Sequence, residues 1–276
     1  GPATLREAGA DALPGTLAAL LDRHLAAAPP EGRVALVGAG PGDPELLTLA
    51  ARRALDEADV VIQDRLVRQP SLELARREAT LIEMGKRGFG PATPQDEIAR
   101  AMIAHARAGA RVVRLKSGDP AIFGRLEEET QALGAAGVPF DVVPGVTAAS
   151  AAAAGLGRSL TARGRNSDLR LLTGHDMAGF AEQDWQALAR PGAVAAIYMG
   201  LRAARFLQGR LMMHGAPGST PVTVVENASR PGERRLPTTL AALPAALAEV
   251  GLSGPAILLL GLAPRDAIAL PLTENA

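Results

Sequence analysis

Four polar or glycine-rich loops follow apolar segments of this chain, and each of them could take part in chemistry. They occupy residues 38–44, 64–66, 117–120 and 198–200. In an open α/β sheet, ligands bind outside the carboxyl ends of the strands, so polar residues in such loops are site candidates by position alone. Asp64 and Asp119 supply carboxylates that could accept protons or hydrogen bonds there.

Positive charge is concentrated in two segments of the chain. Residues 84–125 carry eight Lys and Arg against three Asp and Glu, and residues 158–170 carry four Arg against one Asp. Because Arg forms paired hydrogen bonds with carboxylates and phosphates, these segments favour a small polyanionic substrate. Arg125 and Arg163 stand beside glycine-rich turns and are the better candidates for contact with it, whereas other arginines fit a solvated helix face.

The loop at 38–44 has some likeness to a dinucleotide-binding fingerprint. Pro41 interrupts the turn and the third glycine comes one residue early, so the pattern is only a weak indication of NAD binding. We favour the other interpretation, a glycine-rich turn between a strand and a helix that needs positive φ angles.

The composition excludes several other kinds of protein. The 276 residues contain no Cys and four His, which rules out disulfides and thiolate nucleophiles and leaves little room for a metal site. Lys plus Arg equals Asp plus Glu at 29 each and 3% of the residues are aromatic, so we expect no nucleic-acid partner. No apolar run is long enough to cross a membrane and no signal peptide is visible, so we expect a cytoplasmic enzyme.

The elements that must position these loops alternate between strand and helix. Strands are predicted at 34–38, 59–62, 79–83, 111–115, 140–143, 169–173, 193–198, 222–226 and 256–261, and helices at 45–57, 71–78, 95–108, 125–136, 147–155, 202–213 and 238–249. This alternation is typical of an α/β fold. It predicts a helical extension over 1–32, α/β domains over 33–144 and 145–265, and a tail over 266–276.

A set of ordered motifs carries a resemblance to a known family. They read VGAGPGDP at 37–44, DRLV at 64–67, GKR at 85–87, PQDEI at 94–98, VVRLKSGDP at 112–120, IFGR at 122–125, VVPGVTAA at 142–149 and TGH at 173–175. Over residues 33–265 the chain thereby resembles the tetrapyrrole methylases, and among them those that act on uroporphyrinogen III.

The resemblance implies two consecutive α/β domains of the tetrapyrrole methylase type, with the active site in the cleft between them, in a homodimer. It implies S-adenosylmethionine as the cofactor and no metal. Two methyl groups would go to C2 and C7 of uroporphyrinogen III, giving precorrin-2 and S-adenosylhomocysteine for sirohaem, cobalamin or haem d1 synthesis. Each transfer moves a methyl group from a sulfonium to a pyrrole carbon, so alignment and desolvation can supply most of the catalysis. The many carboxylates of this substrate would account for the arginine-rich segments.

Site roles follow motif by motif from the resemblance. Asp64 matches the proposed proton acceptor and Lys86 the proposed proton donor, although a salt bridge to Arg65 and a simple substrate contact would also explain them. The cofactor-contacting positions are Pro41, Ser117, Gly118, Asp119, Ile122, Thr147, Ala148, Met199, Ala228 and Ala256. The substrate-handling positions are Arg65, Arg125, Glu128 and Arg163. Met199 could instead be packed in a core at a strand end.

Several positions depart from the family pattern. Gln63 stands where Tyr is usual, Ser117 and Ala228 where Gly is usual, and Leu126-Glu127 where Gly-Gly is usual. A Cβ at position 117 narrows the cofactor loop, and Leu126-Glu127 changes the turn that holds Arg125. These departures leave alternatives open. They are a methylase of the same fold that acts on a later precorrin, an RNA or protein methylase, and a tetrapyrrole carrier without activity.

Overall fold

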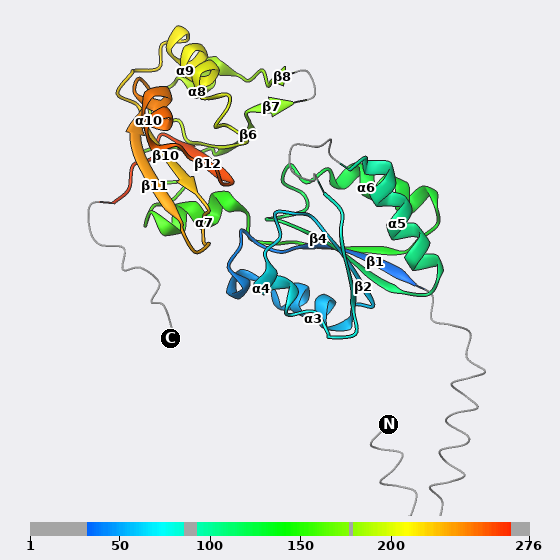
Figure 1. Ribbon diagram of the computed structural model, residues 1–276. Helices are drawn as coiled ribbons and strands as arrows, with labels where there is room; N and C mark the ends of the chain where they lie inside the picture. Colours follow the sequence, from blue (N-terminus) through cyan, green and yellow to red (C-terminus); the bar gives the residue numbers. More distant parts are fainter. Residues whose placement is uncertain (1–31, 86–92, 177–178, 266–276) are drawn as a thin grey trace, which may run out of the picture.

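The first half of the molecule is a parallel five-stranded sheet with helices on both faces (Figure 1). The computed structural model describes residues 32–85, 93–176 and 179–265. The sheet order is β3-β2-β4-β1-β5. Its strands are β1 (Arg33–Gly38), β2 (Val60–Gln63), β3 (Thr80–Glu83), β4 (Arg111–Lys116) and β5 (Phe140–Val143). The helices are α3 (Leu49–Glu57), α4 (Gln69–Leu72), α5 (Gln95–Arg107) and α6 (Leu126–Ala135).

The second half contains another five-stranded sheet, of order β11-β10-β12-β9-β6. Its strands are β6 (Arg170–Thr173), β9 (Ala195–Tyr198), β10 (Pro221–Glu226), β11 (Arg234–Thr239) and β12 (Ala256–Leu260). The helices are α7 (Ala148–Gly155), α8 (Trp185–Leu188), α9 (Ala204–Met213) and α10 (Leu243–Val250), and β7 (His175–Asp176) pairs with β8 (Gly179–Phe180) as a separate ribbon. The predicted α/β class is confirmed.

Both sheets bury apolar side chains on their two faces. In β12, Leu258 and Leu260 pack with α8, α9 and α10, whereas Ile257 and Leu259 pack with α7 on the opposite face. In β1, Val34 and Leu36 likewise pack with α5 and α6, on the face opposite α3. Since successive side chains of a strand point to opposite faces, a sheet covered on both sides requires such continuous apolar runs. The central strands, which carry these runs, are therefore clear in the sequence.

The second sheet is mixed, and one of its strands was not predicted from the sequence. Only the β6–β9 pair is parallel, while β9, β12, β10 and β11 pair antiparallel. The strand β11 was missed, and the helix expected over 238–249 begins at Leu243. The β11 side chains are mostly exposed, because this strand lies at the sheet edge and its segment lacks an apolar run.

Two helices of the first half are shorter than predicted. The helix expected over 45–57 is divided into a single 3-10 turn, Pro44–Leu46, and α3. Each piece has its own N-cap, because the Asp43 side chain accepts a hydrogen bond from the Glu45 N–H and the Thr48 hydroxyl accepts one from the Ala51 N–H. The helix expected over 71–78 is the single turn α4.

Some expectations fall outside the part of the chain that the structure describes. The helical extension is one of them, since only its last residue is described, and the tail over 266–276 is another. The domain boundaries near residues 144 and 145 stay a prediction. Across the ranges that are described, no helix has both the length and the apolar character to span a membrane.

Candidate functional site

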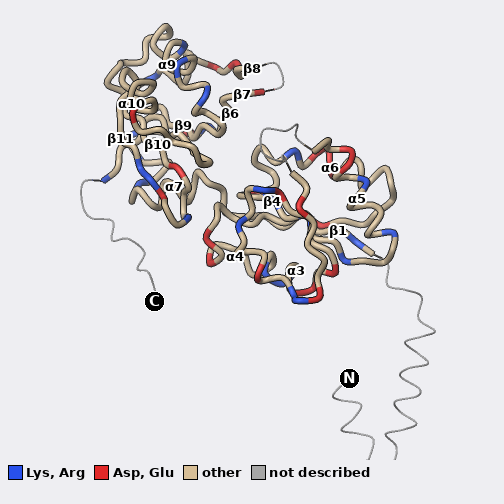
Figure 2. The backbone as a smooth tube through the Cα atoms, in the orientation of Figure 1, with Lys and Arg blue, Asp and Glu red and all other residues tan. Residues whose placement is uncertain are grey.

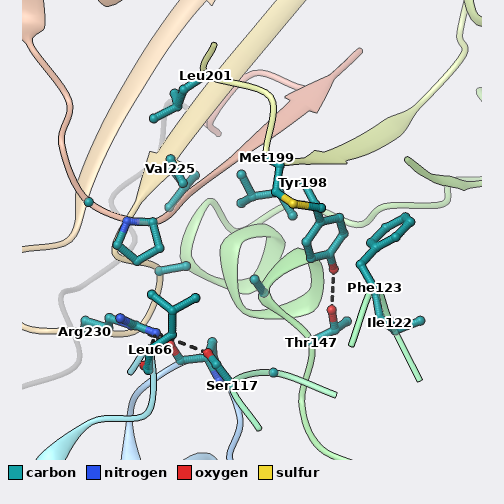
Figure 3. Close-up of a pocket in the computed structure, with 18 of the residues that line it drawn as sticks. Leu66, Ser117, Ile122, Phe123, Thr147, Tyr198, Met199, Leu201, Val225 and Arg230 are labelled. Carbon is teal, nitrogen blue, oxygen red and sulfur yellow. Dashed lines mark hydrogen bonds between the residues drawn. The ribbon is translucent and has the colours of Figure 1, made fainter. Parts of the chain in front are cut away.

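A cavity of about 670 Å³ is lined by residues of both halves of the molecule. Its walls come from the loops after β1, β2 and β4 in the first half, and from the ends of β9, β10 and β12 in the second (Figure 3). The structure brings all ten predicted cofactor positions to this cavity: Pro41, Ser117, Gly118, Asp119, Ile122, Thr147, Ala148, Met199, Ala228 and Ala256. Their role in binding stays a prediction, whereas their convergence is an observation.

The cavity is also lined by residues that were not predicted from the sequence as site residues. They include Leu66, Phe123, His175, Tyr198, Leu201, Arg202, Val225, Arg230, Ser253, Gly254, Pro255 and Ile257. Leu66 and Tyr198 stand in loops already singled out, so position alone could have found them. The turn over 253–255 precedes its strand, so the rule of carboxyl ends does not point to it. It reaches the cavity because β12 runs antiparallel to β10, which places the start of β12 beside the end of β10.

The loops after β1 and β4 are joined backbone to backbone. Gly40 and Gly118 form two hydrogen bonds, from Gly40 N–H to Gly118 O at 3.1 Å and from Gly118 N–H to Gly40 O at 2.7 Å. Both residues have positive φ, +68° and +74°, which confirms the expected glycine-rich turn. A Cβ on Gly118 would meet nothing within 4 Å. The backbone at Gly118 is therefore left uncovered beside the cavity.

Asp119 fixes the shape of its own loop. One carboxylate oxygen accepts a hydrogen bond from the Ala121 N–H at 2.8 Å, and the other accepts one from the Gly145 N–H at 2.9 Å. The second bond ties the loop after β4 to the segment that leaves β5. Each oxygen retains a further lone pair, so the carboxylate can still accept hydrogen bonds from a ligand in the cavity.

Tyr198 links the end of β9 to the start of α7 (Figure 3). Its hydroxyl is hydrogen-bonded to the Thr147 hydroxyl and accepts a bond from the Ala149 N–H at 3.3 Å. Burial raises the pKa of Tyr198, so the phenol stays protonated at neutral pH. The next residue, Met199, has φ +52° and is 53% exposed, so it lies on the cavity wall and not in a core.

Asp64 follows β2 and is paired with a buried guanidinium. The Arg114 side chain donates to Asp64 and, through Nε, to Glu129 at 3.1 Å. Lys116 Nζ donates to the other oxygen of Glu129 at 2.7 Å, and Gln95 adds a third donor at 2.8 Å. Glu129 is 0% exposed, so this cluster connects the interior of the first half to Asp64.

The buried cluster corrects part of the charge argument. Figure 2 shows the charged residues of β4 in the middle of the first half. Arg114 and Lys116 were counted among the cations available to a polyanionic substrate, but they are 2% and 4% exposed and face Glu129. Burial lowers the pKa of Lys116, and the charge of Glu129 opposes that shift. These two cations neutralise a buried carboxylate and do not face solvent.

The predicted substrate residues lie outside the cavity. Arg125 pairs with Glu128, Nε to Oε1 at 2.8 Å, and this hydrogen bond raises the pKa of Arg125 and lowers that of Glu128. Arg163 lies in a separate hollow of about 520 Å³ formed by residues 161–167. Arg65 precedes the cavity residue Leu66 along the chain. The predicted proton donor, Lys86, lies outside the described residues.

The departures from the family pattern have distinct surroundings. Gln63 has a buried side-chain oxygen with no hydrogen-bond partner among the described residues. Leu126 packs against the core of the first half, while Glu127 is exposed. Ala228 is 7% exposed, and the Ser117 hydroxyl accepts a hydrogen bond from Arg230.

Comparison with known proteins places these observations in a family. The model of the tetrapyrrole (corrin/porphyrin) methylases matches residues 33–244. The chain belongs to the tetrapyrrole methylases. Within this family, a siroheme synthase of Gluconacetobacter diazotrophicus is 46% identical over 253 residues, which cover 91% of this chain and 54% of the relative. The chain thus spans about half the length of the curated relatives it matches.

Two solved structures of tetrapyrrole methylases are similar to this chain. The uroporphyrin-III C-methyl transferase of Thermus thermophilus, complexed with S-adenyl homocysteine, is 42% identical with a TM-score of 0.71. The match covers 83% of this chain and 97% of that one. A cobalt precorrin-4 methyltransferase has a TM-score of 0.74 at 29% identity, and the match covers 83% of this chain and 94% of that one. The two share the fold about equally, whereas the sequence is nearer to the first.

Proposed function

We propose that this chain transfers two methyl groups from S-adenosylmethionine to C2 and C7 of uroporphyrinogen III. The products are precorrin-2 and S-adenosylhomocysteine. The proposal rests chiefly on one observation, the convergence of all ten predicted cofactor positions on a single cavity between the sheets. The nearer sequence likeness to a uroporphyrin-III methyl transferase supports this acceptor over a later precorrin.

The residues around the cavity fit the cofactor. A volume of about 670 Å³ lies within the range of small-molecule sites. Leu66, Ile122 and Val225 offer apolar surface to the adenosine, and the Asp119 carboxylate can accept hydrogen bonds from hydroxyl or amino groups. The open space beside the Gly118 Cα allows a ligand to approach the backbone closely. When bound, S-adenosylmethionine supplies an electrophilic methyl group on a positively charged sulfur.

Acceptor chemistry falls to residues outside the cavity. Asp64 is held by Arg114 beside the turn that leads to Leu66, and it is our candidate proton acceptor. Methylation of a substituted pyrrole carbon leaves a positive charge on the ring system, and loss of a proton to a nearby carboxylate removes that charge. Arg65, Arg125 and Arg163 are candidates for the carboxylates of the acceptor, with Glu128 orienting Arg125. Lys86 stays our candidate proton donor.

An anaerobic assay with uroporphyrinogen III and excess S-adenosylmethionine tests the proposal. Product mass should rise by two methyl groups. Asp64→Asn should lower the rate by about 10²–10⁴-fold and leave the Kd for S-adenosylhomocysteine unchanged. Arg205→Ala, an exposed change on α9, is the matched control and should leave both unchanged. Cofactor binding without methylation of uroporphyrinogen III would contradict the proposed acceptor and favour a later precorrin.

The assembly and location belong to the proposal as well. We expect a homodimer in the cytoplasm, with the product used for sirohaem, cobalamin or haem d1. Sedimentation equilibrium would check the dimer, and a monomer at micromolar concentration would contradict it.

A further inference from the structure

Arg230 crosses from the second half of the molecule to the first. It follows β10, and its guanidinium contacts three loops of the first sheet (Figure 3). Nε donates to the Pro41 carbonyl at 2.6 Å, and Nη2 donates to the Leu66 carbonyl at 3.1 Å and to the Ser117 hydroxyl at 3.4 Å. These acceptors stand in the loops after β1, β2 and β4, and all three residues line the cavity.

The first half is shaped to receive this side chain. A Cβ on Gly42 would lie 2.5 Å from both Cγ and Nε of Arg230, so a glycine is needed for the guanidinium to pass. Gly42 also has φ +149°, a value that residues with a Cβ rarely adopt. Beside it, the Asp43 N–H donates to the Ser229 hydroxyl at 3.2 Å, which adds a second link between the halves.

The turn that carries Arg230 is held in an uncommon conformation. Asn227 and Ser229 have φ +53° and +60°, which is uncommon for residues other than glycine. Such conformations persist only where the surroundings fix them, and they cluster at functional sites. Here the Glu233 carboxylate accepts a hydrogen bond from the Ser229 N–H at 2.7 Å, and the Arg230 N–H donates to the Asn227 carbonyl at 2.8 Å.

The contacts of Arg230 also reach the turn of the candidate proton acceptor. Leu66 lies between Asp64 and Val67, whose N–H donates to the Asp64 carbonyl at 3.0 Å. A hydrogen bond to the Leu66 carbonyl therefore constrains the same turn from the side of the cavity. The guanidinium is half-buried, so its hydrogen bonds are only partly exposed to competition from water.

We propose that Arg230 is a positioning residue that clasps the two halves together and closes one wall of the cofactor cavity. By fixing Pro41, Leu66 and Ser117 at once, it sets the affinity for the cofactor and the placement of the turn at Asp64. The statement about affinity rests on the proposed function, whereas the clasp itself does not. Ser117 stands where the resemblance leads us to expect glycine, so the third contact depends on a residue that departs from the usual family pattern.

Amide hydrogen exchange of the protein without ligand tests the clasp. In Arg230→Ala, exchange at Asp43 and Val67 should become faster, because their hydrogen bonds to Ser229 and Asp64 lose the constraint from the guanidinium. Arg230→Lys should give an intermediate effect, because one ammonium cannot reproduce the planar fork. Arg205→Ala removes an exposed Arg of the same half, for which no contact with the first half is recorded among the described residues, and should leave exchange unchanged. Unchanged exchange in Arg230→Ala would overturn the clasp.

Calorimetric titration with S-adenosylhomocysteine tests the effect on the cavity. Arg230→Ala should raise the Kd about tenfold, as expected for lost hydrogen bonds to a charged group, and Ser117→Gly should raise it about twofold. Product masses should shift toward the singly methylated acceptor in Arg230→Ala, because a lower affinity for the cofactor leaves the second transfer incomplete. An unchanged Kd in Arg230→Ala would overturn the role in affinity. If the unmodified protein did not bind S-adenosylhomocysteine, the proposed function would be wrong, and the exchange experiment would still decide the clasp.

Discussion

Each half of the molecule contains one buried glutamate that supports the candidate site, and the two work differently. Glu129 in the first half accepts hydrogen bonds from side chains alone within the described part of the chain, those of Gln95, Arg114 and Lys116. Glu226 in the second half accepts two from backbone, the Ser253 N–H at 2.7 Å and the Gly254 N–H at 2.5 Å, and one from Arg234. Glu129 therefore holds charged side chains in place, whereas Glu226 holds backbone N–H groups in place.

The difference follows what each half has to present. Through Arg114, Glu129 reaches Asp64, a carboxylate that the proposed chemistry needs in a fixed orientation. Glu226 holds the turn at 253–254, whose backbone forms part of the cavity wall. Because Asp64 is oriented through a series of ion pairs, loss of the charge on Glu129 should disturb the position of Asp64 as well. Loss of the Glu226 charge should change the cavity wall only at the turn over 253–254, since the pairing of β10 with β12 remains.

Replacement of Glu129 should have the largest effect. Glu129→Gln leaves Lys116 buried without its ion-pair partner and leaves Arg114 paired with Asp64 alone, so the free energy of unfolding should fall by about 3–5 kcal/mol in urea titrations. Methyl transfer should fall as well, while the Kd for S-adenosylhomocysteine stays unchanged, because Glu129 does not line the cavity. Breaking the exposed Asp96–Arg100 pair with Arg100→Ala is the matched control and should cost about 0.3–0.5 kcal/mol or less. An equally small cost in Glu129→Gln would remove the contrast between the two glutamates.

Replacement of Glu226 should have a smaller effect on stability and a different one on binding. In Glu226→Gln, the new amide group must face either the two backbone N–H groups or Arg234, so one donor set loses its acceptor. We expect a loss of about 1–3 kcal/mol in the free energy of unfolding. The Kd for S-adenosylhomocysteine should rise, because the turn at 253–254 lines the cavity. A Kd that rises in Glu129→Gln but not in Glu226→Gln would reverse the assignment.

The contribution of Glu226 to stability should also depend on pH. Burial alone would raise the pKa of Glu226, but the hydrogen bonds from Arg234, Gly254 and Ser253 outweigh it and lower the pKa below its ordinary value of 4.5. A carboxyl whose pKa is lower in the folded state stabilises the fold above the unfolded pKa and loses this contribution as pH falls through the folded one. Stability should therefore decrease below about pH 4.5, and less steeply in Glu226→Gln. Equal slopes in the two proteins would contradict the shift.

The two glutamates also show how far a sequence can be interpreted. The apolar strands of both halves and the glycine-rich turn could be predicted from the residues, because strand periodicity and turn glycines are local signals. The ten cavity positions were predicted from the resemblance to the tetrapyrrole methylases. The partners of Glu129 and Glu226 could not be predicted, because they come from distant elements: Arg114 and Lys116 were counted with the cations that favour a polyanionic substrate. Arg230 was missed for the same reason, since nothing near it in the sequence indicates that three loops of the other half receive it.

The smallest expected effect concerns Arg125, whose backbone strain is local, unlike the contacts of the two glutamates with residues distant in the sequence. It holds φ +55° at the start of α6, in the position before Leu126 where the family pattern leads us to expect a more flexible turn. Arg125→Gly and Arg125→Ala both lose the exposed ion pair with Glu128, but only glycine is free of the cost of the left-handed conformation. The glycine variant should therefore be more stable than the alanine variant by about 1 kcal/mol in urea titrations. Both variants should bind uroporphyrinogen III more weakly and S-adenosylhomocysteine as before, because the cation is lost in each and Arg125 does not line the cavity. Equal stabilities would show that the Arg125 side chain, and not the turn, fixes this conformation, because the backbone would then relax in both variants. Unchanged acceptor affinity would remove Arg125 from the substrate site.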